Sequence, residues 1–301
     1  MSGFPATTTY SSLVDEIVSN LRGYTSAPDQ ITTLIYPVTA IASVFQVKEI
    51  AEVSKGVVEI GSELIYVKRT DATSQAAYTE AAWRGFRGTL AEAHNTGDTV
   101  TYSPLFPRSV VEREINNVIQ SIYPLVFGVK SYEFTPTGVT PQYDIPVGAN
   151  RVMDVNQYLD AYVAWERIRS WDVRHNVGAP SVTGIQLDLF GRALTGRRIR
   201  VLYASGPTPL VNPTDVFTTV TGLPESARDI IVFGVQWRLA QNLDLARLGV
   251  ATVEADELGQ TRTVGSAMQV SSTFYKLYQA ALERERARLN LLYPARIHEV
   301  R

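Results

Sequence analysis

The sequence contains no cysteine, which excludes disulfide bonds, thiolate zinc sites and cysteine nucleophiles together. It also lacks an excess of either charge, because 28 Lys and Arg residues stand against 30 Asp and Glu residues. A protein that grips DNA is normally basic, so a formal net charge of −2 argues against tight binding to phosphate backbones. DNA could still pass such a protein without being held by it.

Long apolar runs are missing as well. No stretch of about 18 apolar residues exists, so no membrane-spanning helix is predicted. Residues 1–10 are small and polar, without a basic segment followed by an apolar one, and we therefore expect no signal peptide. Hydrophobic residues nevertheless make up 45% of the chain and charged residues 19%, an ordinary globular ratio that allows substantial buried cores.

Recognisable chemistry is also absent from the sequence. The three histidines, His94, His175 and His298, share no metal-ligand spacing, and we expect them to be surface or loop residues. No G-x-S-x-G, P-loop or G-x-G-x-x-G motif occurs, so the sequence predicts no enzyme, no cofactor and no metal site. A hydrolase with two carboxylates far apart in sequence is the enzyme class that this pattern leaves open.

Apolar residues at helical spacing predict four helices. Their expected ranges are 11–23, 107–123, 224–248 and 266–292. In the first, Leu13, Ile17 and Leu21 repeat every four residues, and Ser12 and Asp15 are the expected N-terminal caps. An amphipathic helix this short is not stable alone, so it must dock on the other helices or on a neighbouring subunit.

Two regions of short β-rich segments separate these helices. The first predicts strands at 43–47, 56–60, 64–69 and 99–102, with an alanine-rich stretch at 76–83 that fits either a helix or a strand. The second predicts strands at 130–135, 143–146, 151–160, 162–170, 184–189 and 198–204. Frequent Gly and Pro turns between these segments favour an antiparallel sandwich or barrel, and residues 197–201 alternate as a one-sided strand would.

The predicted class is therefore α+β. We expect a helical core, made of the N-terminal, middle and two C-terminal helices, with a small β-module and an antiparallel β-sandwich inserted into it. The corresponding segments are 1–37, 38–103, 104–128, 129–206 and 207–301. Helices so far apart in sequence should leave apolar surface for sister copies to cover.

Two groups of charged residues and one tryptophan are candidate interface residues. The basic cluster Arg192, Arg197, Arg198 and Arg200 fits either a charged edge that blocks unwanted strand pairing or a surface facing another subunit or DNA. Arg284, Arg286 and Arg288 alternate with glutamates on the last helix, as on a solvated face or a protein–protein surface. Trp237 widens the apolar stripe of the preceding helix, and such residues suit interfaces and cores alike.

A longer motif runs through the first β region. It consists of Gly61-Ser62-Glu63-Leu64-Ile65-Tyr66-Val67, then Arg84-Gly85-Phe86-Arg87-Gly88-Thr89, a stretch of small residues, His94, and a turn at Gly97. The glycines permit tight turns between strands, and we expect the Arg and the His to tie the turn together by hydrogen bonds. This motif resembles a β-module that recurs in virion proteins of tailed bacteriophages.

The order of the remaining elements resembles head–tail adaptor (connector) proteins of long-tailed phages. The resemblance implies a virion structural protein of the neck that forms a dodecameric ring and meets the host cytoplasm only during assembly. Its partners would be further copies of itself, the portal protein, and stopper, tail-terminator or tail proteins. Genomic DNA would pass through the ring without specific binding, and no membrane would be involved.

Other functions remain open on the sequence. A tail-terminator, minor tail or baseplate protein could carry the same β-module and bind tail-tube subunits in place of portal. The sandwich could instead serve as a carbohydrate- or receptor-binding virion module, which an exposed platform of Trp165 and Trp171 would favour.

Overall fold

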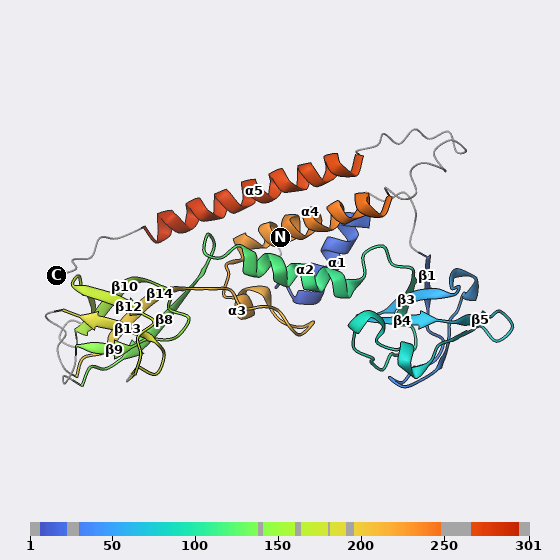
Figure 1. Cartoon of the computed structure of the whole chain (residues 1–301), viewed down its shortest axis with the longest axis horizontal. Helices are drawn as coiled ribbons and strands as arrows, with labels where there is room; N and C mark the ends of the chain where they lie inside the picture. The colour runs from blue at the N-terminus through green and yellow to red at the C-terminus, as the bar shows by residue number, and fades with distance from the viewer. Residues whose placement is uncertain are drawn as a thin grey trace, which may run out of the picture. The chain divides into compact units, whose positions relative to one another are not determined.

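The computed structural model describes residues 7–22, 30–137, 141–159, 164–179, 181–190, 196–247 and 266–294. It is a mixed α+β structure with small antiparallel sheets, which confirms the predicted class. Its α-helices are α1 (Tyr10–Arg22), α2 (Arg108–Ser121), α3 (Phe217–Thr221), α4 (Arg228–Arg247) and α5 (Ser266–Leu292), as Figure 1 shows. Within the described ranges, no helix has the length and apolar character needed to cross a membrane.

The chain divides into two compact units. The first comprises Met1–Tyr10, Val118–Ile231 and Lys276–Arg301, and the second comprises Ser11–Asn117 and Val232–Tyr275. Because the division falls within α2, α4 and α5, each of these helices contributes residues to both units.

The β-module of the second unit contains two antiparallel sheets, with strand orders β1-β7-β3-β4 and β2-β6-β5. Its strands are β1 (Gln30–Thr33), β2 (Val44–Gln46), β3 (Gly56–Ile60), β4 (Glu63–Val67), β5 (Arg69–Asp71), β6 (Ala76–Tyr78) and β7 (Thr99–Tyr102). Strands of both sheets supply one buried core, which includes Phe45, Val58, Ile65 and Ala77. The predicted strands 56–60 and 99–102 are confirmed at both ends, whereas the predicted strand 64–69 is divided between β4 and β5.

The first unit holds a β-sandwich with sheets β11-β10-β14-β8 and β12-β13-β9. Its strands are β8 (Gly128–Phe134), β9 (Gln142–Asp144), β10 (Arg151–Leu159), β11 (Ala164–Arg167), β12 (Trp171–His175), β13 (Ile185–Leu189) and β14 (Ile199–Ser205). A shared core contains Val155, Trp171, Leu187 and Val201. The one-sided character predicted for 197–201 is confirmed, since Ile199 and Val201 are buried and Arg200 between them is partly exposed.

The predicted helix positions hold, but the expected capping of the first helix is wrong. The helix α1 begins at Tyr10, so Ser12 and Asp15 lie inside it. The backbone N–H of Tyr10 donates to the carbonyl of Asp215, a residue distant in sequence that a local capping rule cannot anticipate. Leu13, Ile17 and Leu21 are buried as predicted.

The other helices bury most of their predicted apolar stripes. The predicted stripe of α2 is at most 1% exposed at all five of its positions, the last of which directly follows the helix: Val111, Ile115, Val118, Ile119 and Ile122. In α5, Phe274, Ala281, Leu282 and Leu289 are buried as expected, but Leu292 is 55% exposed. Glu285, which interrupts the stripe in sequence, is buried because Arg288 on the next turn pairs with its carboxylate at 2.6 Å.

Candidate functional site

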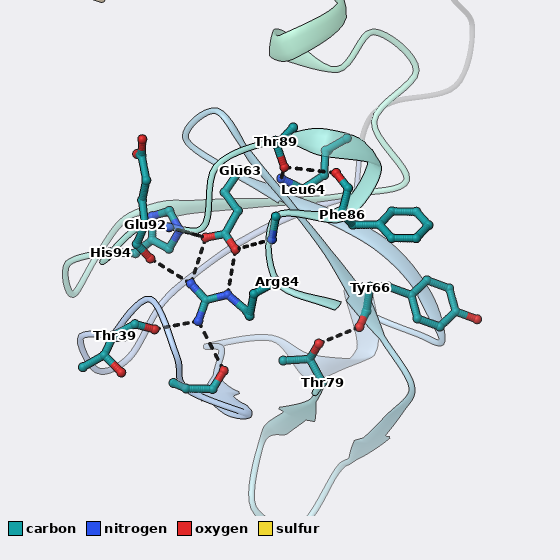
Figure 2. Close-up of polar contacts among 12 residues, drawn as sticks. Thr39, Glu63, Leu64, Tyr66, Thr79, Arg84, Phe86, Thr89, Glu92 and His94 are labelled. Atoms are coloured by element: carbon teal, nitrogen blue, oxygen red, sulfur yellow. Dashed lines mark hydrogen bonds and ion pairs between the residues drawn. The ribbon is translucent and has the colours of Figure 1, made fainter. Parts of the chain in front are cut away.

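Three ionisable side chains of the β-module meet in its interior. Glu63 opens β4, Arg84 directly follows a short 3-10 helix (Ala81–Trp83), and His94 forms an isolated backbone bridge with Val38. The side chains of Glu63, Arg84 and His94 are 0%, 1% and 5% exposed. We call these three residues the clamp, and Figure 2 shows their side chains converging on the Glu63 carboxylate.

The carboxylate of Glu63 is fully used as an acceptor. Its Oε1 accepts from Arg84 Nε at 2.7 Å and from the Gly85 amide at 3.0 Å. Its Oε2 accepts from an Arg84 terminal nitrogen at 2.8 Å and from the Glu92 amide at 3.2 Å, and lies 2.7 Å from His94 Nε2. A carboxylate has about four lone-pair sites, so no acceptor capacity is left for a ligand.

The guanidinium of Arg84 is equally saturated. Besides its two bonds to Glu63, it donates to the carbonyls of Thr39 at 2.6 Å, Ala42 at 3.2 Å and Glu92 at 2.8 Å. These partners match all five N–H groups of an arginine. Arg84 therefore joins β4 to two loops that are distant in sequence, and the expected hydrogen bonding by the Arg and the His of the motif is confirmed.

Electrostatics favour the ionised carboxylate. Burial alone would raise the pKa of Glu63, but hydrogen bonds from Arg84, from His94 and from the amides of Gly85 and Glu92 outweigh it. Together they lower the pKa of Glu63 to about 2. The clamp thus holds a stable buried anion with its counter-charge, and it fastens the loop 84–94 to the sheet.

The remaining motif residues shape this loop. Gly85 has φ 62°, and a Cβ atom there would lie 2.5 Å from the carbonyl oxygen of Thr89. The hydroxyl of Thr89 accepts from the amide of Leu64 on β4 and donates to the carbonyl of Phe86, both at 3.0 Å. Each of these motif residues has a structural task within the chain itself.

Replacing Gly85 by Ala should destabilise the second unit by about 2–3 kcal/mol, because the substitution combines left-handed backbone strain with a clash against a backbone oxygen. Gly88 is the matched control, since its φ is 83° but a Cβ there meets nothing within 4 Å. Gly88→Ala should cost only about 1 kcal/mol. Urea unfolding of both variants measures the difference, and equal costs would show that the contact with Thr89 is unimportant.

An aromatic cluster lies on the outer side of the same loop. The rings of Tyr66, Trp83 and Phe86 have centroids 5.1–5.8 Å apart, and all three side chains are partly exposed. Figure 2 shows Tyr66 and Phe86 directed away from the clamp. Lys68 lies over the Trp83 ring at 5.8 Å and pairs with Glu80. The clamp therefore fixes the backbone from which two of these rings project.

The basic cluster predicted near 192–200 is divided by the structure. Arg198 and Arg200 lie on the outer face of the sandwich with Glu133, which is 3.8 Å from Arg198 and 2.7 Å from Arg200. Arg200 also lies 3.9 Å from the ring centroid of Trp165, and Arg198 lies 4.6 Å from that of Tyr158. Arg197 is partly exposed just before β14, and Arg192 lies outside the described residues. These contacts give Arg198 and Arg200 partners within their own sheet.

A joint platform of Trp165 and Trp171 is absent from this part of the described structure. Trp171 is 4% exposed and belongs to the sandwich core, whereas Trp165 is partly exposed on β11 and packs against Tyr158 at 5.2 Å. The predicted strand 162–170 missed the separate strand β12, which begins at Trp171. The expected platform of Trp165 and Trp171, which would have favoured carbohydrate binding, is therefore wrong.

The candidate residues of α4 and α5 are partnered within their units. Trp237 packs against Tyr275 with ring centroids 4.8 Å apart. The three arginines form ion pairs, whose partners are Asp229 for Arg284, Glu283 for Arg286, and Glu285 for Arg288. The Arg288–Glu285 pair is the one with a buried carboxylate, and hydrogen bonds from Arg288 to Glu285 raise the pKa of Arg288.

Sequence reasoning misplaced one histidine and left the role of one glutamate unassigned. His94 lies in a loop, but it is only 6% exposed, so a surface position is wrong for it, while His175 is exposed and His298 lies outside the described residues. Glu63 was part of the motif, but nothing in its spacing marks it as the centre of the network. Glu63 is a charged residue at the start of an otherwise apolar strand, and the same module contains an Arg and a His. That combination is the sequence signal that could have identified Glu63 as the centre of the network.

Comparisons with known proteins add no assignment. No protein-family model matches the chain, and no curated protein matches its sequence. In the part of the chain that the structure describes, no group of three or more His, Asp or Glu residues is arranged to hold a metal ion.

Proposed function

We propose that this chain is a structural protein of a tailed-phage virion, a head–tail adaptor that forms a ring between portal and tail around the DNA channel. The observation that carries the proposal is the clamp. Glu63, Arg84 and His94 belong to the motif on which the resemblance to phage virion β-modules rests, and they saturate one another in the interior. The clamp residues therefore stabilise the β-module itself, which supports a structural role in an assembly.

Exposed apolar side chains on α5 offer a surface for sister copies. Leu291 is 83% exposed and Leu292 55%, near the end of the helix, and Leu277 is 42% exposed. Covering such side chains by a neighbouring copy would contribute about 1.5–3 kcal/mol for each that becomes fully buried. A head-to-tail contact of this kind, repeated around a rotation axis, closes into a ring. The proposed dodecamer would meet portal on one side and stopper or tail proteins on the other.

Negative-stain microscopy of the purified chain, alone and mixed with portal, tests this function. We expect rings that stack on portal particles. Substituting Leu291 and Leu292 together by Asn should reduce the fraction of rings at least tenfold, because it removes apolar area that the neighbour would cover. The matched control is Val182→Asn, since Val182 is 91% exposed in the sandwich and should not affect ring formation.

The test also separates the alternatives. Rings that bind tail-tube subunits but ignore portal would favour the tail-terminator, minor tail or baseplate function. Particles that remain monomeric and bind neither partner would contradict every assembly function considered for this chain.

A further inference from the structure

A second buried carboxylate lies on the opposite face of the sheet that carries the clamp. In β3, Val58 and Ile60 point into the core of the β-module, so Glu59 between them points to the other face. Glu59 is only 5% exposed, although it is a charged residue in the middle of a strand. Its neighbours across the sheet, Leu64 on β4 and Thr101 on β7, are also buried.

Glu59 meets the N-terminus of α2. Its Oε1 accepts a hydrogen bond of 2.5 Å from the backbone N–H of Arg108, the first residue of that helix. The first amides of a helix have no partner within the helix, and the helix dipole favours an acceptor at this end. A carboxyl group on a strand therefore serves as the cap of a helix, and it joins the β-module to the helical part of the second unit.

Further charged groups surround this joint. Arg108 pairs through its side chain with Asp15 of α1, and Arg22 of α1 adds a second positive charge near Glu59. Glu112, one turn along α2, accepts a hydrogen bond of 2.9 Å from the hydroxyl of Ser62 in the β3–β4 turn. Glu59 and Glu112 thus bring two carboxyl groups to one contact between a sheet and a helix.

Burial dominates the titration of both carboxyl groups. The pKa of Glu59 is raised to about 7, chiefly by desolvation and to a smaller extent by the charge of Glu112, against the hydrogen bond and charge of Arg108 and the charge of Arg22. Desolvation also raises the pKa of Glu112, with a smaller contribution from Glu92, although Ser62 and Arg108 oppose it. Near neutral pH, Glu59 is therefore close to its pKa, so both its protonated and its ionised form are populated.

We propose that the joint between the β-module and α2 is a pH-responsive contact, closed while Glu59 carries a proton and loosened when Glu59 and Glu112 are both ionised. Protonated Glu59 still accepts from the Arg108 amide and leaves no uncompensated charge in a buried place. Ionised Glu59 keeps that bond but places a second negative charge beside Glu112 within the same contact. The proposal concerns one unit of a single chain and does not rest on the proposed function.

The direction follows from the two states of Glu59. In the open joint it is solvated and titrates at its ordinary value of 4.5, whereas in the closed joint it titrates at about 7. The closed joint therefore binds a proton more tightly, and its stability is lost as pH rises from about 4.5 through 7. Between pH 6 and pH 8.5 the equilibrium constant for opening should rise about tenfold.

Hydrogen exchange of the full-length chain at pH 6 and pH 8.5 tests the proposal. Protection factors, which are corrected for the intrinsic exchange rate, should fall about tenfold for amides in the first turns of α2, and should stay constant for β14 in the other unit. Glu59→Gln keeps the shape and the acceptor but cannot ionise, so the protection in this variant should lose most of its pH dependence, with Glu112 as the remaining titrating group. The matched control Glu49→Gln alters an exposed glutamate of the same module and should keep the tenfold change.

A second variant provides an independent readout. Glu112→Gln removes the neighbouring negative charge, so the midpoint of the change in protection should move to lower pH. Protection that is independent of pH in the natural sequence, an unchanged slope in Glu59→Gln, or an unmoved midpoint in Glu112→Gln would overturn the proposal.

Discussion

Replacing Arg84 by Met should lower the free energy of unfolding of the second unit by about 3–5 kcal/mol, since it leaves the Glu63 carboxylate buried without its counter-charge. The substitution also removes the guanidinium donor of the carbonyls of Thr39 and Ala42, although the Thr39 carbonyl still accepts from the Ala42 amide. Urea unfolding followed through amide exchange of β3 and β4 measures the effect.

The control for this substitution lies in the same loop. Arg87 is exposed and its guanidinium is 5.6 Å from the Phe86 ring, so Arg87→Met should change stability by no more than about 0.5–1 kcal/mol. Replacing Glu63 and Arg84 together by Met should cost less than the sum of the two single changes, because no unpaired charge remains. Equal effects of Arg84→Met and Arg87→Met would contradict a structural role for the clamp.

Acidification should also weaken the second unit through Glu63. The pKa of Glu63 is about 2 in the folded chain and 4.5 as the ordinary value, so its contribution is present above pH 4.5 and is lost as pH falls through 2. The loss amounts to about 3 kcal/mol, since one pKa unit corresponds to about 1.4 kcal/mol. Unfolding free energies measured at intervals between pH 5 and pH 2 provide the curve.

Other carboxylates also have lowered pKa values, so the comparison needs a variant that lacks the Glu63 carboxylate. Asp71 and Glu80 of the same unit, for example, have pKa values lowered chiefly by side-chain hydrogen bonds, from Ser74 and from Lys68. Glu63→Gln should be less stable at pH 5 and should lose about 3 kcal/mol less than the natural sequence on acidification. Parallel curves for the two proteins would assign the acid sensitivity to residues other than Glu63.

The sequence predicted those elements whose pattern is local and long. The helix α5 matches the expected range 266–292 at both ends, because its apolar stripe spans several turns. The strands β3 and β7 were placed correctly because they are rich in β-branched residues and glycine-containing turns adjoin them. Where the pattern is short, as in β12, the strand was not predicted, because the expected strand 162–170 ends just before it.

The errors arose where distant residues decide the local structure. Tyr10 begins α1 because of a backbone bond to Asp215, which no pattern near residue 10 reveals. Leu292 continues the apolar stripe in sequence, but the rest of the described chain leaves it 55% exposed. Glu285 reads as an interruption of that stripe, yet its ion pair with Arg288 allows it to be buried.

The candidate site was predicted only in part for the same reason. The motif showed that Arg84 and His94 should tie a turn together, because glycines and polar residues alternate there. It did not show that both bind Glu63, since Arg84 and His94 follow it by 21 and 31 positions. The joint at Glu59 was missed altogether, because a glutamate in a strand normally indicates a solvated face.

Native mass spectrometry of the full-length chain over a range of concentrations tests most directly whether the protein acts by assembling. We expect a single closed oligomer of fixed copy number that replaces the monomer as concentration rises, and that forms less readily when Leu291 and Leu292 are changed to Asn. A monomer at every concentration, with or without portal, would contradict this expectation.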